Sequence, residues 1–178
     1  LGVLGVVHAL GGDVVAASGA FAQMKPLDGR GRRHRVALAR GESELIDDSY
    51  NASPASIRAA IAVLAASQPG QGGRRIAVLG DMLEMGDRAA ELHAALAQPL
   101  ADARIDLVFT VGDAMASLDG ALPKAMRGGH DADSGAMAER IAATLRPGDV
   151  VSVKGSHGIR MDKIVSRLTA TPALAAKG

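Results

Sequence analysis

The sequence predicts an α/β fold in which an open, mostly parallel sheet is flanked by helices. Near-continuous apolar runs at residues 75–79, 107–111 and 150–154 lead directly into glycine and polar residues. Such runs are typical of parallel strands that are buried on both faces. Segments with apolar residues at helical spacing alternate with these runs, and strands that alternate with helices favour right-handed crossovers and a parallel sheet.

The composition narrows the classes of function. The 178 residues carry a formal net charge of +1, and aromatic residues make up 2%. Nucleic-acid binding is disfavoured, because neither a basic stripe nor a base-stacking surface is available. The chain has no cysteine and its five histidines lie far apart, so we expect no zinc or other metal site. The apolar run at residues 1–10 is too short to span a membrane.

Residues 1–29 predict a helical hairpin that precedes the sheet. One helix ends at Gly11 and Gly12, and Asp13 is a suitable cap for a second helix from Val14 to Met24. Because this hairpin is small and apolar, we expect it to be the end of a further, upstream domain, and the chain to be a fragment. The Pro/Gly/Arg-rich connector at 25–33 marks the boundary to a domain at 30–170, which a flexible tail at 171–178 follows.

The remaining elements follow from local patterns. The expected strands lie at residues 35–39, 44–47, 75–79, 107–111, 128–130 (a weak edge candidate) and 150–154. The expected helices cover residues 55–66, 88–103, 114–122, 134–145 and 159–168. Ser53 is a good N-cap for the first of these helices, and Pro54 suits its first turn, where a missing N–H costs nothing.

Polar residues gather at the carboxyl ends of the expected strands, where an open parallel sheet binds ligands. These ends lie at residues 48–51, 80–82, 112–113 and 154–158. Since side chains alternate along a strand, only one of Asp47 and Asp48 can face the crevice. Lys154 closes an apolar strand and either holds a carboxylate or phosphate or lies extended at the edge. Ordinary solvated loops are the alternative interpretation of all these ends.

Several nucleotide and nucleophile motifs are missing from the sequence. No Gly-Lys-Ser/Thr occurs, so the chain has no phosphate-binding P-loop. The near matches to G-x-G-x-x-G at residues 29–34 and 70–75 lack the last glycine, and no G-x-S-x-G nucleophile elbow is present. An independent dinucleotide-binding domain is therefore poorly supported.

Three segments together resemble the Mur ligase family, in particular its members that attach D-alanyl-D-alanine. They lie at residues 47–54 (DDSYNASP), at 77–86 (AVLGDMLEMG) with Leu92 and His93, and at 153–156 (VKGS) with Arg160 and Met161. Gly29 and Arg30 fit the family's connector. Ser53 departs from the pattern, because the family has a second asparagine there and a hydroxyl cannot make a two-ended amide contact.

The resemblance implies the Rossmann-like C-terminal domain of a three-domain, cytoplasmic and monomeric ligase, preceded by the last helices of its central domain. In the family, ATP phosphorylates the carboxylate of UDP-N-acetylmuramoyl-tripeptide, and the amine of D-alanyl-D-alanine attacks the acyl phosphate, in bacterial peptidoglycan synthesis. ATP and Mg²⁺ would be bound mainly by the central domain, so this chain would be inactive alone.

The resemblance also assigns residues. Arg30 and Asp48 match the arginine and aspartate that reach the phosphate and the ribose of ATP, and Ser49 and Asn51 would line the same crevice. The residues that would lie near the D-alanyl-D-alanine carboxylate are Asp81, Met82, Lys154, Gly155 and Ser156. The alternatives are a standalone flavodoxin-like module that binds a nucleotide or another small molecule, and a non-catalytic interaction domain.

Overall fold

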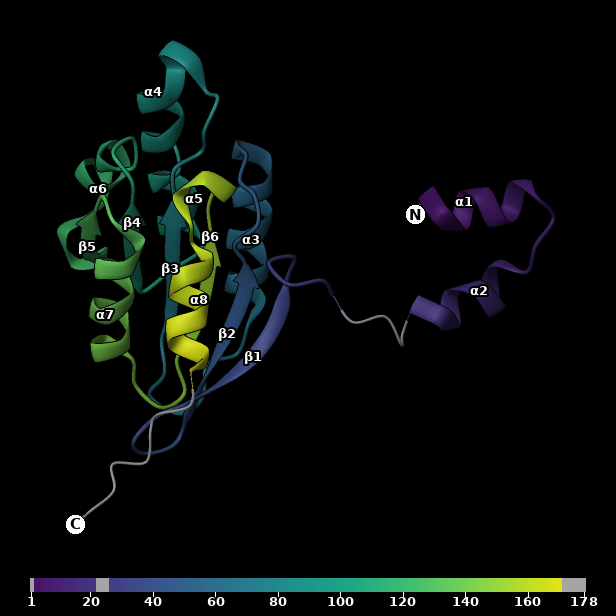
Figure 1. The fold of residues 1–178 in the computed structure, drawn as a ribbon, viewed down its shortest axis with the longest axis horizontal. Helices are drawn as coiled ribbons and strands as arrows, with labels where there is room; N and C mark the ends of the chain where they lie inside the picture. The colour runs from purple at the N-terminus through teal and green to yellow at the C-terminus, as the bar shows by residue number, and fades with distance from the viewer. Residues whose placement is uncertain (1, 22–25, 171–178) are drawn as a thin grey trace.

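The computed structural model describes residues 2–21 and 26–170 (Figure 1). One six-stranded sheet has the order β1-β2-β6-β3-β4-β5. β1 pairs antiparallel with β2, and the other neighbours are parallel, which confirms the predicted mostly parallel sheet. The strands are β1 (Arg32–Ala37), β2 (Glu42–Asp48), β3 (Arg75–Gly80), β4 (Leu107–Val111), β5 (Arg127–Asp131) and β6 (Val150–Lys154).

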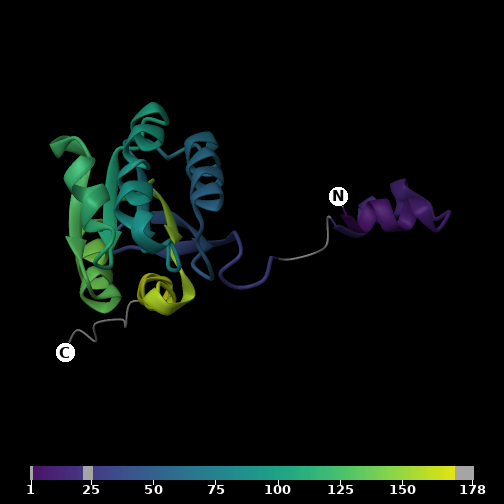
Figure 2. The ribbon, with the colours of Figure 1, turned by 90° about the horizontal axis from the view of Figure 1, so that it is seen from above.

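Helices cover both faces of this sheet, as the view from above in Figure 2 shows. The helices are α3 (Pro54–Ala66), α4 (Ala89–Ala94), α5 (Ala97–Asp102), α6 (Ala116–Ala121), α7 (Ser134–Thr144) and α8 (Asp162–Thr169). Alternate side chains of each strand point to opposite faces. Ala77 and Leu79 of β3 therefore pack with α3, α5 and α6, whereas Ile76 and Val78 pack with α7 and α8. The two apolar layers hold the carboxyl ends of the central strands in one row.

Two predicted helices differ from those observed. The single helix expected over 88–103 is wrong, because the chain forms α4 and α5 with a break between them. Pro99 would clash with the carbonyl of Ala95 in a continuous helix, but within the first turn of α5 its missing N–H costs nothing. The helix expected from residue 159 begins only at Asp162, because Arg160 adopts a left-handed conformation with φ of 58°.

The amino-terminal hairpin consists of α1 (Gly2–Ala9) and α2 (Val14–Phe21). The Asp13 carboxylate accepts hydrogen bonds from the N–H groups of Val15 and Ala16, which confirms it as the cap. Neither helix has a buried residue, and both views show the hairpin apart from the sheet. The predicted end of the second helix and the predicted tail at 171–178 lie outside the described residues. Within the described ranges, no helix has the length and apolar content needed to cross a bilayer.

Candidate functional site

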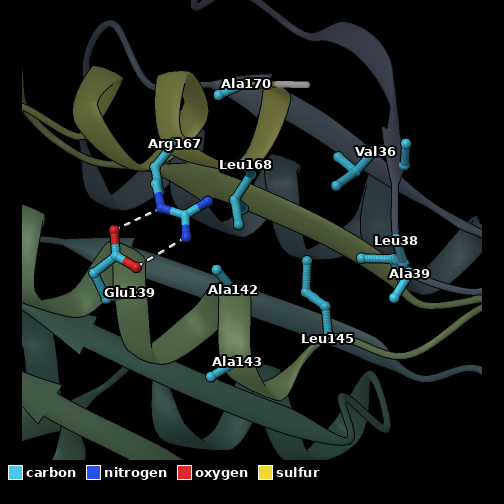
Figure 3. A pocket seen from close by; sticks show the side chains of 11 residues that line it. Val36, Leu38, Ala39, Glu139, Ala142, Ala143, Leu145, Arg167, Leu168 and Ala170 are labelled. Atoms are coloured by element: carbon cyan, nitrogen blue, oxygen red, sulfur yellow. Dashed lines mark hydrogen bonds and ion pairs between the residues drawn. The ribbon is translucent and has the colours of Figure 1, made fainter. Parts of the chain in front are cut away.

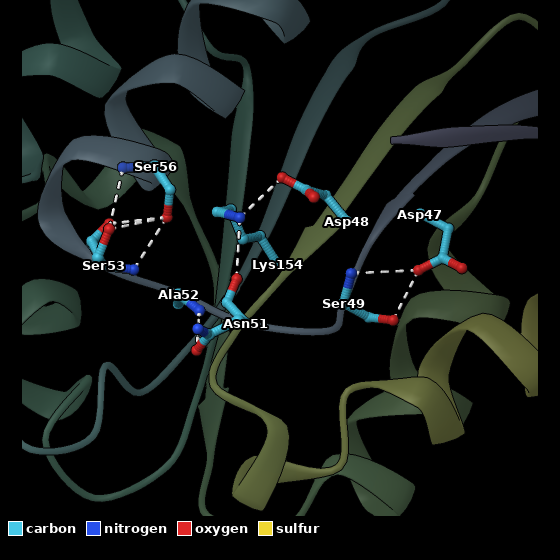
Figure 4. Close-up of polar contacts among 8 residues, drawn as sticks. All are labelled: Asp47, Asp48, Ser49, Asn51, Ala52, Ser53, Ser56 and Lys154. Carbon is cyan, nitrogen blue, oxygen red and sulfur yellow. Dashed lines mark hydrogen bonds and ion pairs between the residues drawn. The ribbon is translucent and has the colours of Figure 1, made fainter. Parts of the chain in front are cut away.

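A pocket of about 530 Å³ lies where β2 and β6 end and α3 begins. Four residues predicted for a site, Arg30, Asp48, Asn51 and Lys154, line it. They come from the connector, the β2–α3 turn and the end of β6, so segments that are far apart in the sequence meet here. Figure 4 shows the polar contacts at this place. The pocket is at the carboxyl edge of the parallel strands, where ligands bind in open α/β sheets.

Asp47 and Asp48 point to opposite sides of β2, as their alternation predicted. Asp48 lines the pocket, whereas Asp47 is buried and does not. The Asp47 carboxylate accepts hydrogen bonds from the Gly29 N–H (2.8 Å) and the Ser49 hydroxyl (2.6 Å). Ser49 is thereby drawn to the opposite face, where it lines a different hollow, so the structure does not bring it together with Arg30 and Asp48. Asp47 and Ser49 shape the turn rather than the pocket.

Lys154 holds a carboxylate, and that carboxylate belongs to the chain itself. Its Nζ donates hydrogen bonds to Asp48 Oδ2 (2.7 Å) and to the Asn51 carbonyl (2.9 Å). Asp48 and Lys154 are neighbours in the parallel β2–β6 register, which brings the two side chains together. The Lys154 side chain is 4% exposed, so the alternative of an extended edge residue is wrong.

Arg30 is held by an aromatic ring that the sequence reasoning did not single out as a site residue. Its guanidinium carbon lies 4.3 Å from the centroid of the Tyr50 ring, within the range of a cation–π contact. The Tyr50 ring also lies near the His157 ring, with ring centroids 5.4 Å apart. Tyr50 is the only tyrosine of the chain, and its place between Ser49 and Asn51 was the available signal.

Gly29 lets the connector approach this turn closely. Its φ of 72° is left-handed, and a Cβ at this position would lie 3.0 Å from the Tyr50 backbone nitrogen. The Tyr50 N–H instead donates to the Gly29 carbonyl at 3.1 Å. Glycine is therefore required for Arg30 to reach the pocket.

Ser53 caps α3, as its sequence position predicted. Its hydroxyl accepts from the Ser56 N–H (3.3 Å), and the Ser56 hydroxyl accepts from the Ser53 N–H (2.9 Å), which forms a capping box. Pro54 occupies the first position of the helix. The Ser53 side chain is committed to the helix start, although the residue also lines the pocket.

The other predicted residues form a separate, buried group at the ends of β3 and β6. Asp81 accepts hydrogen bonds from the N–H groups of Ala114 (3.2 Å) and Met115 (2.8 Å). The Ser156 hydroxyl accepts from the Leu83 N–H at 3.0 Å. Asp81, Met82, Gly155 and Ser156 do not line the pocket of Arg30 and Asp48. Their side chains and backbone fix the loop that follows β3.

His93 anchors the same loop, a role that the sequence reasoning missed. The ring is fully buried, and its Nε2 accepts from the Met82 N–H at 2.9 Å. Its Nδ1 lies 2.6 Å from the Ala89 carbonyl, which makes Nδ1 the protonated nitrogen. His93 thus joins the loop after β3 to the start of α4.

Two further features bear on the kind of site. Among residues 2–21 and 26–170, no group of three or more His, Asp or Glu side chains is placed to hold a metal ion. A second hollow of about 460 Å³ lies between β1, α7 and α8 (Figure 3), at the amino end of the parallel strands. Its lining is mainly aliphatic, and Glu139 and Arg167 there pair with each other (2.9 Å). The polar pocket at the carboxyl edge is the better candidate site.

The chain is similar to known proteins over most of its length. Residues 31–157 match the family model described as Mur ligase, glutamate ligase domain. The chain is 30% identical over 96% of its length to the UDP-N-acetylmuramoyl-tripeptide–D-alanyl-D-alanine ligase of Bacillus subtilis and 32% identical over 89% of its length to that of Escherichia coli. It spans 39% and 33% of the length of these two relatives.

The fold is also similar to that of solved MurF ligase structures. The fold is similar to that of the MurF ligase from Thermotoga maritima in complex with ADP, with a TM-score of 0.73 and 27% sequence identity. It is equally similar to a crystal structure of MurF from Acinetobacter baumannii, with a TM-score of 0.73 and 25% identity. Each likeness covers 93% of this chain, and 36% and 35% of the respective structures.

Proposed function

The chain belongs to the Mur ligase family, and on this basis we propose that it forms the C-terminal part of an ATP-dependent ligase. The complete enzyme joins D-alanyl-D-alanine to UDP-N-acetylmuramoyl-tripeptide through an acyl phosphate, in peptidoglycan synthesis. Relatives with this activity in their names match most of the chain. The observation that carries the proposal is the convergence of Arg30, Asp48 and Asn51 on one pocket at the carboxyl edge of the sheet.

In this proposal the pocket closes over ATP. The Arg30 guanidinium offers a planar set of donors that suits a phosphate group. The Asp48 side chain, 30% exposed, offers carboxylate oxygens that can accept from ribose hydroxyls. The ADP complex of the Thermotoga maritima relative supports a nucleotide as ligand of the family. Ser49 contributes only indirectly, because its hydroxyl is committed to Asp47.

A larger polypeptide is part of the proposal. The described residues carry no metal-binding cluster, and Asp48 is already paired with Lys154, so this side of the site does not fit Mg²⁺. We assign Mg²⁺ and the phosphate-binding loop to a central domain, of which α1 and α2 are the last helices. Val3, Leu10 and Val15 have exposed apolar side chains, which supports a further domain that packs against α1 and α2. Residues 30–170 then form the C-terminal domain.

The incoming dipeptide is assigned to the loops after β3 and β6. The buried contacts of Asp81 and Ser156 hold these loops rigid, and their backbone can then orient D-alanyl-D-alanine. Rigid placement of the amine against the acyl phosphate lowers the barrier of this step, because positioning replaces a random encounter. Positioning and electrostatic stabilisation are the main contributions that a protein makes to phosphoryl transfer.

The test compares the complete ligase with the 178-residue chain in a phosphate-release assay. We expect the complete ligase to release phosphate only when ATP, UDP-N-acetylmuramoyl-tripeptide and D-alanyl-D-alanine are all present, and the chain alone to release none. Asp48→Asn in the complete ligase should raise the KM for ATP, whereas Glu139→Gln, in the remote hollow of Figure 3, should not. ATP hydrolysis by the chain alone would contradict the proposal and favour a standalone nucleotide-binding module.

A further inference from the structure

Lys154 is buried although it borders the proposed nucleotide pocket. The residue is 3% exposed, and its ammonium has two acceptors within the chain, Asp48 Oδ2 at 2.7 Å and the Asn51 carbonyl at 2.9 Å (Figure 4). A buried ammonium without such partners would be strongly disfavoured, because burial removes its hydration. The two contacts are therefore the reason that a charge can lie here.

Both acceptors belong to the short turn that joins β2 to α3. Asp48 ends β2, and Asn51 lies shortly before the first residue of α3. Lys154 ends the neighbouring strand β6 and reaches across to both ends of the turn. Because a carboxylate is planar, holding Oδ2 also sets the direction of Oδ1. The lysine thus determines how Asp48 faces the pocket.

We propose that Lys154 is a positioning residue that acts through Asp48 and the Asn51 carbonyl, and not a ligand of the dipeptide carboxylate. Its charge compensates Asp48 and keeps that carboxylate in the orientation in which it accepts from the nucleotide. Two of the three N–H donors of the ammonium are already used within the chain. This inference rests on the proposed function, since it takes the ligand of Asp48 to be ATP.

The test is a double-mutant cycle in the complete ligase, with Lys154→Met, Asp48→Asn and the double variant. Methionine keeps much of the length of lysine but has neither charge nor donors. We expect Lys154→Met to raise the KM for ATP about ten- to a hundredfold, as the loss of a charged hydrogen bond does, and to leave the KM for D-alanyl-D-alanine within about twofold. If Lys154 acts through Asp48, the double variant is no more than about threefold worse than the worse single variant, because residues in one network are not additive.

Several outcomes overturn the inference. One is a raised KM for D-alanyl-D-alanine with an unchanged KM for ATP, which makes Lys154 a ligand of the dipeptide. Another is a double variant in which the two single effects multiply. If Asp48→Asn raises the KM for ATP but Lys154→Met does not, the positioning role fails and the proposed function stands. If Asp48→Asn leaves the KM for ATP unchanged, both fail.

Folding of the variants is controlled separately. Circular dichroism and thermal unfolding of each variant show whether a kinetic change reflects a misfolded protein. If Lys154→Met loses the folded signal, Lys154→Gln takes its place. Its amide can still donate hydrogen bonds but carries no charge, so we expect the KM for ATP to rise by less than in Lys154→Met and the KM for D-alanyl-D-alanine to stay unchanged.

Discussion

Replacing Asp81 with alanine should destabilise the sheet domain. Asp81 is 6% exposed, and its carboxylate accepts from the N–H groups of Ala114 and Met115, at 3.2 Å and 2.8 Å. Met115 is fully buried, so water cannot replace the lost acceptor there. A buried donor without a partner costs about 1–3 kcal/mol. For the two donors together we expect a loss of about 2–4 kcal/mol in the free energy of unfolding, since Ala114 is only partly buried.

The assay is urea unfolding of the 178-residue chain, followed by circular dichroism. The midpoint should fall while the denaturant slope stays unchanged, because the surface exposed on unfolding is the same. The melting temperature should fall by roughly 5–15 °C, as expected for a domain of this size. The matched control is Asp113→Ala, since Asp113 is an exposed aspartate close by in the fold. The control should change the stability by less than about 0.5 kcal/mol.

An unchanged stability of Asp81→Ala would refute this reasoning. If Asp81→Ala unfolds at the same urea concentration as the parent chain, the hydrogen bonds to Ala114 and Met115 contribute nothing to stability. If Asp81→Ala in the complete ligase nevertheless raises the KM for D-alanyl-D-alanine above that of the parent enzyme, Asp81 contacts that substrate directly, as the family resemblance implied. A stability loss without a change in substrate KM supports the role of Asp81 in holding the loop.

Two further predictions concern the Arg30 contact and the start of α7. Tyr50→Leu should raise the KM for ATP in the complete ligase several-fold, because a cation–π contact is worth about 0.5–1 kcal/mol at exposed sites, whereas Tyr50→Phe keeps the ring over Arg30 and should not. The Asp133 carboxylate caps α7, and the hydrogen bond from the Ala136 N–H lowers its pKa below the ordinary 3.8. A carboxylate whose pKa is lowered by folding stabilises the folded state at pH values above its ordinary, unfolded-state pKa. This stabilisation is lost as the pH falls through the folded-state pKa. Asp133→Asn, which caps without titrating, should therefore flatten the pH dependence of stability below about pH 4; an unchanged profile would show that the cap makes no pH-dependent contribution.

Local pattern predicted the inner strands well and the first strand and some helices less well. The strand expected at 35–39 lies instead at Arg32–Ala37. The strands at 107–111 and 150–154 were predicted with the observed bounds, because buried β-branched runs are flanked by polar turns. The helix expected over 88–103 was wrong, since apolar periodicity continues across the break between α4 and α5, and Pro99 lies in the first turn of α5. The helix expected from residue 159 began late, because the left-handed backbone of Arg160 depends on tertiary packing that periodicity does not report.

Local reasoning predicted the direction of single side chains at the candidate pocket better than it predicted which side chains lie together. Alternation along β2 was enough to separate Asp48 from Asp47, and cap chemistry was enough to assign Ser53. The expected grouping of Lys154 with Asp81 and Ser156 differs from the observed one, in which Lys154 lines the pocket of Arg30 and Asp48. The contact of Tyr50 with Arg30 depends on how the connector folds back at Gly29, which no local pattern contains.

The period and chemistry of neighbouring residues therefore established the fold class, most strands and the direction of single side chains, because these depend on local backbone geometry. Strand order depends instead on how distant apolar faces pack. The order β1-β2-β6-β3-β4-β5 inserts β6, the last strand among the described residues, between β2 and β3. That insertion places Lys154 beside Asp48, a residue 106 positions earlier, and only the packed sheet decides whether the charge of the lysine meets a substrate or the chain's own carboxylate.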